Sequence, residues 1–404
     1  MIPPAEGRRK TGLAFLYFFL LVAGCAMLRP LRDEVAVRGG IARMPWLFTG
    51  SLLATLLVIP LSARAASRCP RRVYFPAMNL FLAGNLVLFH AAFRHPSLLR
   101  GAEAAFFLWL NVFSLLSISF AWSVMSDVFT AEHARRAFGL VAGGASLGSI
   151  AGPAAATLAA AHGRPETLLL LAAAMLAGAA GTARMLLAGR REEEPLRAGA
   201  LTALSSAFRS PILRRLAVIM ACSTAVSTIA YFWQAEIVGA AITDTRLRTQ
   251  YFATIDLSVN ALAALLQLFV TGQAIRRFGI AASLVAVSAL VTLAAAAVGL
   301  APGLATVVAL QLIHRIGHFA VGRPAREVLL VPLGADERFH AKNFIDTAVY
   351  RAGDAGSAWA LSALRATGAG FHAVAGIAVA IGIVWTATNS GVGRREVPSP
   401  DLAR

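Results

Sequence analysis

The chain has 404 residues, of which 58% are hydrophobic and 14% are charged. Soluble proteins are about 45–50% apolar and about 25% charged, so this composition excludes an ordinary soluble fold. The formal net charge is +17 at pH 7, but the basic residues lie between long apolar stretches, which argues against a nucleic-acid-binding face. The composition predicts a polytopic helical membrane protein.

Apolar stretches of the length needed to cross a bilayer, about 20 residues, follow one another along nearly the whole chain. Residues 189–211 interrupt them with two arginines and three consecutive glutamates. We therefore predict an N-terminal half over 1–188, a linker over 189–211 and a C-terminal half over 212–404. The twelve predicted spans cover approximately residues 11–28, 45–63, 73–93, 104–126, 138–161, 166–187, 212–236, 250–274, 280–300, 303–322, 344–364 and 371–389.

Arginine and lysine are concentrated on alternate connections between the predicted spans, and basic connections mark the cytoplasmic side. The basic side collects the N-terminus, the linker and the C-terminal tail. We therefore predict a bacterial inner-membrane protein with both termini and the linker in the cytoplasm.

Six spans followed by six spans, with cytoplasmic termini and linker, is the arrangement of the major facilitator superfamily, whose halves are related repeats. In that arrangement spans 1, 4, 7 and 10 line a central cavity. Charges are costly in lipid, and the intramembrane charges lie in predicted spans 8, 10 and 11 and at the ends of 1, 4 and 7. The sequence thus predicts an all-α, major-facilitator-like bundle of twelve transmembrane helices.

Motifs for other activities are not supported. The chain has two lysines, Lys10 and Lys342, and neither lies in the G-x-x-x-x-G-K-[ST] pattern of a phosphate-binding loop. This excludes an ATP-hydrolysing pump. Residues 144–148 fit G-x-S-x-G, but they lie in an apolar helix, where Gly144, Gly148 and Gly152 instead predict close helix packing. The three cysteines lack metal-site spacing. We predict no enzyme activity, catalytic residue, metal or cofactor.

A charged cluster closes the first predicted span. Arg29 and Arg32 share a helix face at i, i+3, and Asp33 follows them. We predict that the two arginines contact an anion at the mouth of the cavity and that Asp33 is a gating group. The alternative is an interfacial anchor with an external salt bridge.

Predicted span 10 carries two histidines and an arginine. His314 and His318 share a face, and Arg315 lies beside His318 at i, i+3. Ionisable groups at membrane depth indicate substrate or proton handling. A packing role for the histidines is the alternative.

Predicted span 11 places Asp346, Tyr350 and Asp354 at i, i+4 and i+8, with Arg351 three residues before Asp354. An Arg351–Asp354 pair that neutralises itself is the structural alternative to a binding role. Asp256 in span 8 is a further buried-charge candidate.

The segment from Arg326 to Gly353 carries the most specific pattern in the chain, and three shorter segments accompany it: Leu28–Asp33, Trp122–Asp127 and His133–Phe138. Taken together, these segments resemble the non-mitochondrial ATP/ADP translocase family, the nucleotide exchangers of plastids and obligate intracellular bacteria. The long segment contributes Arg326-Glu327, Val331-Pro332-Leu333, Lys342, Ile345-Asp346, Arg351 and Gly353. The resemblance implies a transporter fold and nucleotide exchange.

The chain departs from that family at three places. The family has a lysine where this chain has Asp354, which changes the local charge by two units and disfavours a polyphosphate. His133 stands where the family has glutamate, and Glu236 matches the glutamate of span 7 only loosely. The resemblance therefore supports a transporter more strongly than it supports nucleotide as the substrate.

We expect a secondary transporter or exchanger of an anionic metabolite, with nucleotide, as in ATP/ADP antiport, the leading candidate. A proton-coupled exporter of another solute and a non-transporting membrane partner are the alternatives. The expected partners are the lipid bilayer and a small anion, without nucleic acid, and the expected state is a monomer. The predicted substrate contacts are Arg29, Arg32, Arg315 and Arg351, and the predicted coupling or gating groups are Asp33, Asp256, His318, Asp346 and Asp354.

Overall fold

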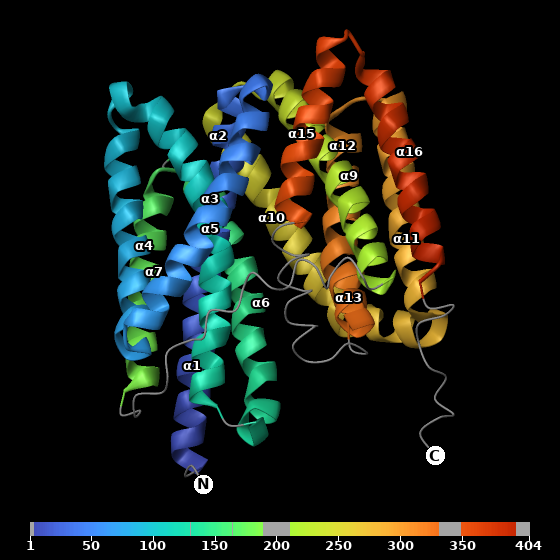
Figure 1. Cartoon of the computed structure of the whole chain (residues 1–404). Coiled ribbons are helices and arrows are strands. Elements are labelled where there is room, and N and C mark those ends of the chain that lie inside the picture. Colours follow the sequence, from blue (N-terminus) through green and yellow to red (C-terminus); the bar gives the residue numbers. More distant parts are fainter. Residues whose placement is uncertain (1–3, 130, 164, 189–210, 331–348, 393–404) are drawn as a thin grey trace, which may run out of the picture. The chain divides into compact units, whose positions relative to one another are not determined.

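The computed structural model describes residues 4–129, 131–163, 165–188, 211–330 and 349–392 (Figure 1). Helices joined by short connections make up these ranges, and no strand occurs within them. Ten helical stretches among the described residues are long and apolar enough to cross a membrane. The fold is the all-helical membrane bundle that the sequence predicts.

The helices follow the predicted spans closely, except that most begin or end a few residues further out. Their bounds are α1 Pro4–Ala26, α2 Arg29–Gly39, η1 Ile41–Arg43, α3 Met44–Arg68, α4 Arg71–Phe93, α5 Pro96–Val128, α6 Ala131–Ala161, α7 Thr167–Leu187, α9 Pro211–Ala241, α10 Thr245–Leu266, η2 Gln267–Thr271, α11 Gly272–Leu300, α12 Leu304–Gly317, η3 His318–Gly322, α13 Arg323–Leu330, α15 Tyr350–Ala366 and α16 Phe371–Ser390.

The longest candidate stretch, Thr245–Leu300, contains two spans. Its 56 residues would measure about 84 Å as one straight helix, far more than the ~30 Å of a hydrocarbon core. Gly279 interrupts the helix with φ of 83°, a backbone conformation that glycine adopts without a Cβ clash. This break lies within one residue of the boundary predicted between spans 8 and 9.

The connection after span 1 is helical, as the shared helix face of Arg29 and Arg32 predicts. It forms α2, with Pro30 in the first turn and Gly40, at φ of 82°, after the last residue. Proline is tolerated in a first turn because the missing N–H has no intrahelical partner there. The helical turns bury Asp33 and Glu34, which an external loop would leave in water.

The chain forms two compact units. The first comprises Met1–Gly40, Leu53–Ala198 and Ile242–Asn260, and the second comprises Ile41–Leu52, Gly199–Ala241 and Ala261–Arg404. Each unit therefore contains one short segment from the other half of the sequence. The predicted linker lies mostly outside the described residues, so the predicted boundaries at 188 and 212 remain predictions.

In the first unit α1 packs against α6 and α7, and α4 packs against α7 (Figure 1). The predicted glycine stripe makes the contact between α6 and α1. A Cβ on Gly148 would lie 2.7 Å from the Phe19 carbonyl oxygen, and one on Gly152 would lie 2.7 Å from that of Ala23. Backbone against backbone leaves no room for a side chain, which confirms the predicted close packing.

In the second unit α9 is the central contact helix. It packs against α12, α15 and α16, while α11 packs against α12 and α16. Helices α12 and α15 carry three of the ionisable residues predicted for this half, Arg315, Arg351 and Asp354, and both helices pack against α9.

Candidate functional site

Met220, Ser223 and Thr228 of α9 contact Arg326, His314 and Asp354, and Thr224 among them packs against Gly353. Met220, Ser223, Thr224 and Thr228 lie at spacings that place them on one side of the helix. Sulfur and small hydroxyl groups at helical spacing can face charged neighbours without occupying much space. These small polar residues within an apolar span are visible in the sequence, but they were not among the predicted site residues.

His314 lies in α12, which packs against α9, and His318 directly follows α12 at the beginning of η3. Their rings are stacked at a centroid distance of 6.5 Å, and His314 is hydrogen-bonded to the backbone of Ser223. Nε2 of the buried His314 has no hydrogen-bond partner in the described structure. The imidazole therefore keeps one nitrogen for a ligand, a proton or water.

Three arginines act electrostatically on the His318 ring: Arg315, Arg323 and Arg326. Arg326 points Nη1 at the sulfur of Met220, at 3.5 Å, and Arg323 lies over the Phe319 ring, 5.9 Å from its centroid. The structure thus places the predicted pair Arg315 and His318 in a cationic cluster. Such a cluster at membrane depth is suited to an anion.

Asp354 on α15 is buried, and its partners include Thr228 and Arg351. Thr228 donates its hydroxyl proton to Oδ1 at 3.3 Å, and Nη1 of Arg351 lies 3.8 Å from Oδ2. Beside them, a Cβ on Gly353 would lie 3.1 Å from the Thr224 methyl, so glycine allows α15 to approach α9 closely. Arg351 and Asp354 thus form the ion pair considered in the sequence analysis, and Arg351 also lies over the Tyr350 ring.

Two π-helical segments, η2 and η3, face each other in the second unit. The side-chain amide of Gln267 in η2 donates to the carbonyl oxygen of Phe319 in η3 at 2.8 Å. A π-helical turn shifts the backbone hydrogen bonds and leaves carbonyl groups to other donors, and such turns are frequent at functional sites. His318 begins η3, so the predicted coupling histidine lies at a backbone irregularity that its sequence did not reveal.

In the first unit Arg32 is held by Asp33 and Asn111. Its Nε and Nη2 lie 2.9 and 2.7 Å from Oδ1 of Asp33, and Nη1 lies 2.9 Å from Oδ1 of Asn111. The guanidinium also lies over the Phe107 ring, 5.7 Å from its centroid. Arg29, at the beginning of α2, is half-buried. The structure therefore brings Arg32 and Asp33 into direct contact.

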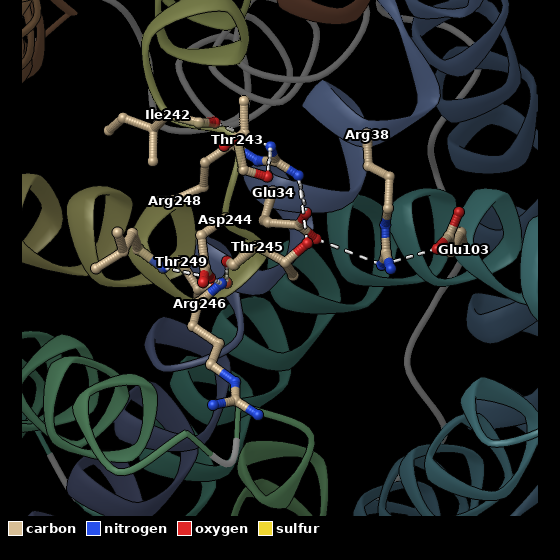
Figure 2. Close-up of polar contacts among 11 residues, drawn as sticks. Glu34, Arg38, Glu103, Ile242, Thr243, Asp244, Thr245, Arg246, Arg248 and Thr249 are labelled. Carbon is tan, nitrogen blue, oxygen red and sulfur yellow. Dashed lines mark hydrogen bonds and ion pairs between the residues drawn. The ribbon is translucent and has the colours of Figure 1, made fainter.

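A second ionic network in the first unit was not predicted. Glu34, fully buried on α2, accepts a hydrogen bond from Nη2 of Arg248 at 2.9 Å, and Arg38 lies between Glu34 and Glu103 (Figure 2). Nη2 of Arg38 is 3.4 Å from Oε2 of Glu34 and 2.7 Å from Oε1 of Glu103. Because 214 residues separate Glu34 from Arg248, no spacing rule could have paired them.

The remaining predicted residues lie elsewhere along the chain. Asp256 is buried on α10, where the Asn260 amide donates to its backbone carbonyl. Asp346 lies outside the described residues. Glu236 pairs with Arg365 at 2.7 Å. Among the described residues, no group of three histidine, cysteine or acidic side chains is arranged to hold a metal ion.

The sequence pattern of the Major Facilitator Superfamily matches residues 11–325 of the chain. The chain belongs to this superfamily. No curated protein matches it closely enough to be counted as a relative.

Solved transporters share the fold. A bacterial homologue of the iron transporter ferroportin is 14% identical, with a TM-score of 0.66, covering 94% of this chain and 98% of that one. The nucleoside transporter NupG is 13% identical, with a TM-score of 0.63 and coverages of 95% and 98%. The human organic anion transporter MFSD10 is 16% identical, with a TM-score of 0.60 and coverages of 96% and 100%. These similarities identify the fold as that of transporters.

Proposed function

We propose that the chain is a secondary transporter that carries an anionic organic solute across a membrane by alternating access. The excess of arginine over acidic residues in the described part of α12, α13 and α15 carries this proposal. Residues 304–330 and 350–366 contain five arginines and two acidic residues, Glu327 and Asp354, and Glu236 of α9 pairs with one of the arginines, Arg365. Positive charge is costly at membrane depth, so a bound anion would stabilise this excess.

The proposed anion contacts in the second unit are Arg315 and Arg351. Arg315 lies in the cluster around His318, and Arg351 lies beside Asp354 at 3.8 Å. Arg29 and Arg32 are the proposed contacts of the first unit, although Arg32 already has two polar partners. A guanidinium suits carboxylate or phosphate because its N–H groups can donate to two oxygens at once.

Nucleotide remains the leading named solute within the anionic class. The segment from Arg326 to Gly353 supports it by resemblance, and the fold is shared with a nucleoside transporter and an organic anion transporter. Asp354 opposes it, because a buried carboxylate repels a polyphosphate.

Proton coupling is the second candidate, and buried titratable groups favour it. His314 keeps Nε2 without a hydrogen-bond partner, and Asp256 and Asp354 are buried carboxyl groups. Asp33 and His318 would serve with them as gating groups. Imidazole and carboxyl groups in a membrane cavity can take up and release a proton during the cycle.

Uptake by purified protein in liposomes tests the proposal. Labelled ATP, ADP and inorganic phosphate are offered with and without a pH gradient, and with and without the same solute inside. Saturable uptake of an anion supports transport, stimulation by internal solute supports exchange, and stimulation by the pH gradient supports proton coupling. Uptake equal to that of empty liposomes for every solute would favour the non-transporting alternative.

For localisation we propose the inner membrane of a bacterium with cytoplasmic termini. The distribution of arginine and lysine supports this orientation. Reporter fusions after Arg404 and within residues 190–210 should both report a cytoplasmic position, and a periplasmic signal from either fusion would contradict it.

A further inference from the structure

The contact between α9 and α15 brings three oxygen-bearing side chains together in the second unit. Thr224 and Thr228 are one helical turn apart on α9, and they are 1% and 2% exposed. Asp354 on α15 is 6% exposed, and its Oδ1 lies 3.3 Å from the Thr228 hydroxyl. Two hydroxyl groups and a carboxylate are hard oxygen ligands, the kind that hard metal cations prefer.

The Thr224 hydroxyl is the observation that points to a ligand. Its Oγ1 is buried and has no hydrogen-bond partner among the described residues. A Cβ on Gly353 would lie 3.7 Å from this oxygen, so the hydroxyl lies close to α15, one residue from Asp354. A buried hydroxyl without a partner is costly. A cation that accepts its lone pairs would remove that cost.

The distance between Thr228 and Asp354 suits a shared cation better than it suits a hydrogen bond. Hydrogen bonds between two oxygens are most often about 2.7–2.8 Å long, whereas this distance is 3.3 Å. Ca²⁺, whose radius nearly equals that of Na⁺, takes oxygen ligands at about 2.3–2.6 Å, so two ligands at a right angle lie about 3.3–3.7 Å apart. A threonine within a helix can donate its proton to the carbonyl four residues earlier and keep its lone pairs for a cation.

The charge of the site selects a monovalent cation. Asp354 supplies one negative charge, and Nη1 of Arg351 already lies 3.8 Å from Oδ2 of this carboxylate. A divalent cation would bring a further positive charge to membrane depth, where charge is costly. A monovalent cation and Arg351 both draw on the same carboxylate, so binding of the cation weakens the attraction between Asp354 and Arg351.

We propose that Thr224, Thr228 and Asp354 bind Na⁺ between α9 and α15, and that the bound ion releases Arg351 to the transported anion. Na⁺ and the anion then each raise the affinity of the protein for the other, which couples their transport. This coupling rests on the proposed function, whereas Na⁺ binding can be measured without any transported solute.

Thermal unfolding of the purified full chain in detergent tests the site. NaCl should raise the unfolding temperature by about 2 °C or more over choline chloride at equal ionic strength, because Na⁺ binds the folded protein. Thr224→Val keeps the shape of the side chain and removes its unpaired hydroxyl, so it should lose the sodium effect without losing stability in choline chloride. Asp354→Asn should also lose the sodium effect. Thr182→Val is the control, because Thr182 is buried but donates to the Ala179 carbonyl of its own helix.

Two further variants separate cation binding from packing. Thr224→Ser keeps the oxygen and should keep the sodium effect, even if Thr224→Val folds poorly. Arg351→Gln removes the competing charge and should lower the Na⁺ concentration for half-maximal stabilisation about tenfold; an unchanged concentration would overturn the competition with Arg351. Equal unfolding temperatures of the unmodified chain in the two salts would overturn the site. A sodium effect that survives in both Thr224→Val and Asp354→Asn would do the same.

Uptake of labelled ATP and inorganic phosphate into liposomes tests the coupling. An inward sodium gradient should raise uptake by the unmodified chain about fivefold or more, and it should not change uptake by Thr224→Val. Stabilisation by Na⁺ in a protein that moves no anion would keep the site and reject the transport function. Uptake driven by a pH gradient, in a protein that Na⁺ does not stabilise, would keep the transport function and reject the site.

Discussion

The two units differ in how far acidic side chains balance their arginines. In the first unit three arginines of α2 and α10 each meet a carboxylate: Arg32 meets Asp33, Arg38 meets Glu103 and Arg248 meets Glu34. In the second unit arginines outnumber acidic residues along α12, α13 and α15. The balanced charges join segments of the first unit, whereas the excess of arginine in the second unit is what the proposed function assigns to an anion.

The largest effect on transport is expected from replacing arginines of the second unit. Arg315→Gln and Arg351→Gln should each lower anion uptake about 100-fold or more, because the site loses a charge that it offers to the solute. Uptake into liposomes measures the loss, and size-exclusion chromatography in detergent checks the fold. Arg277→Gln, an exposed arginine of the same unit that lies over Phe278, is the control and should transport normally. Unchanged uptake by both test variants would make these arginines structural.

The balanced charges should respond in stability instead. Asp33→Asn leaves the half-buried guanidinium of Arg32 with Asn111 and Phe107 but without its carboxylate. Removing one partner of a buried ion pair costs about 3 kcal/mol or more, so the unfolding transition in detergent should move to a clearly lower temperature. Asp244→Asn, at the exposed beginning of α10, keeps its capping hydrogen bonds and should change stability little. Equal stability of the two variants would show that Arg32 does not need Asp33.

The helical spans seen among the described residues could be predicted because the apolar length and the flanking charges are local properties of the sequence. The glycine stripe of α6 was predictable for the same reason, since spacing four on a helix marks one face. The partners of Glu34 and of Asp354 were not predictable, because they depend on contacts between helices distant in sequence, as Arg248 and Thr228 show. The burial of Asp33 and Glu34 on α2 was not predictable either, because it depends on the helices that pack around them.

The tightness of helix packing at glycine also differs between the two units. Gly148→Ala places a Cβ against the backbone of α1, 2.7 Å from the Phe19 carbonyl oxygen, which cannot rotate away. Gly353→Ala meets the Thr224 methyl at 3.1 Å, and that side chain can adjust. We expect about 2 kcal/mol of destabilisation for the first and about 0.5 kcal/mol for the second, measured by unfolding in detergent. Gly139→Ala, which meets nothing within 4 Å, is the control. A larger loss at Gly353 would indicate that α15, not α6, is the tightly fixed helix.

The smallest effect is expected at Asp354, where two hypotheses give opposite forecasts. If the second unit binds nucleotide, Asp354→Lys restores the charge of the nucleotide exchangers and should raise ATP or ADP binding. We expect a rise of no more than about tenfold, ~1.4 kcal/mol, because Arg351 loses its partner at the same time. If Asp354 instead neutralises Arg351 or carries a coupling proton, two like charges at i, i+3 will weaken the site and uptake will fall.

Titration calorimetry with ATP and with inorganic phosphate, on the unmodified protein and on Asp354→Lys, separates these forecasts. Asp354→Asn is the control, because it removes the negative charge without adding a positive one beside Arg351. Tighter ATP binding in the order Asp, Asn, Lys would support a nucleotide site. Weaker binding with Lys than with Asn would mean that repulsion from Arg351 outweighs attraction to the ligand. In that case the cationic surplus of the second unit is already matched to a solute with fewer negative charges than a nucleotide, and the carboxylate of Asp354 sets that match.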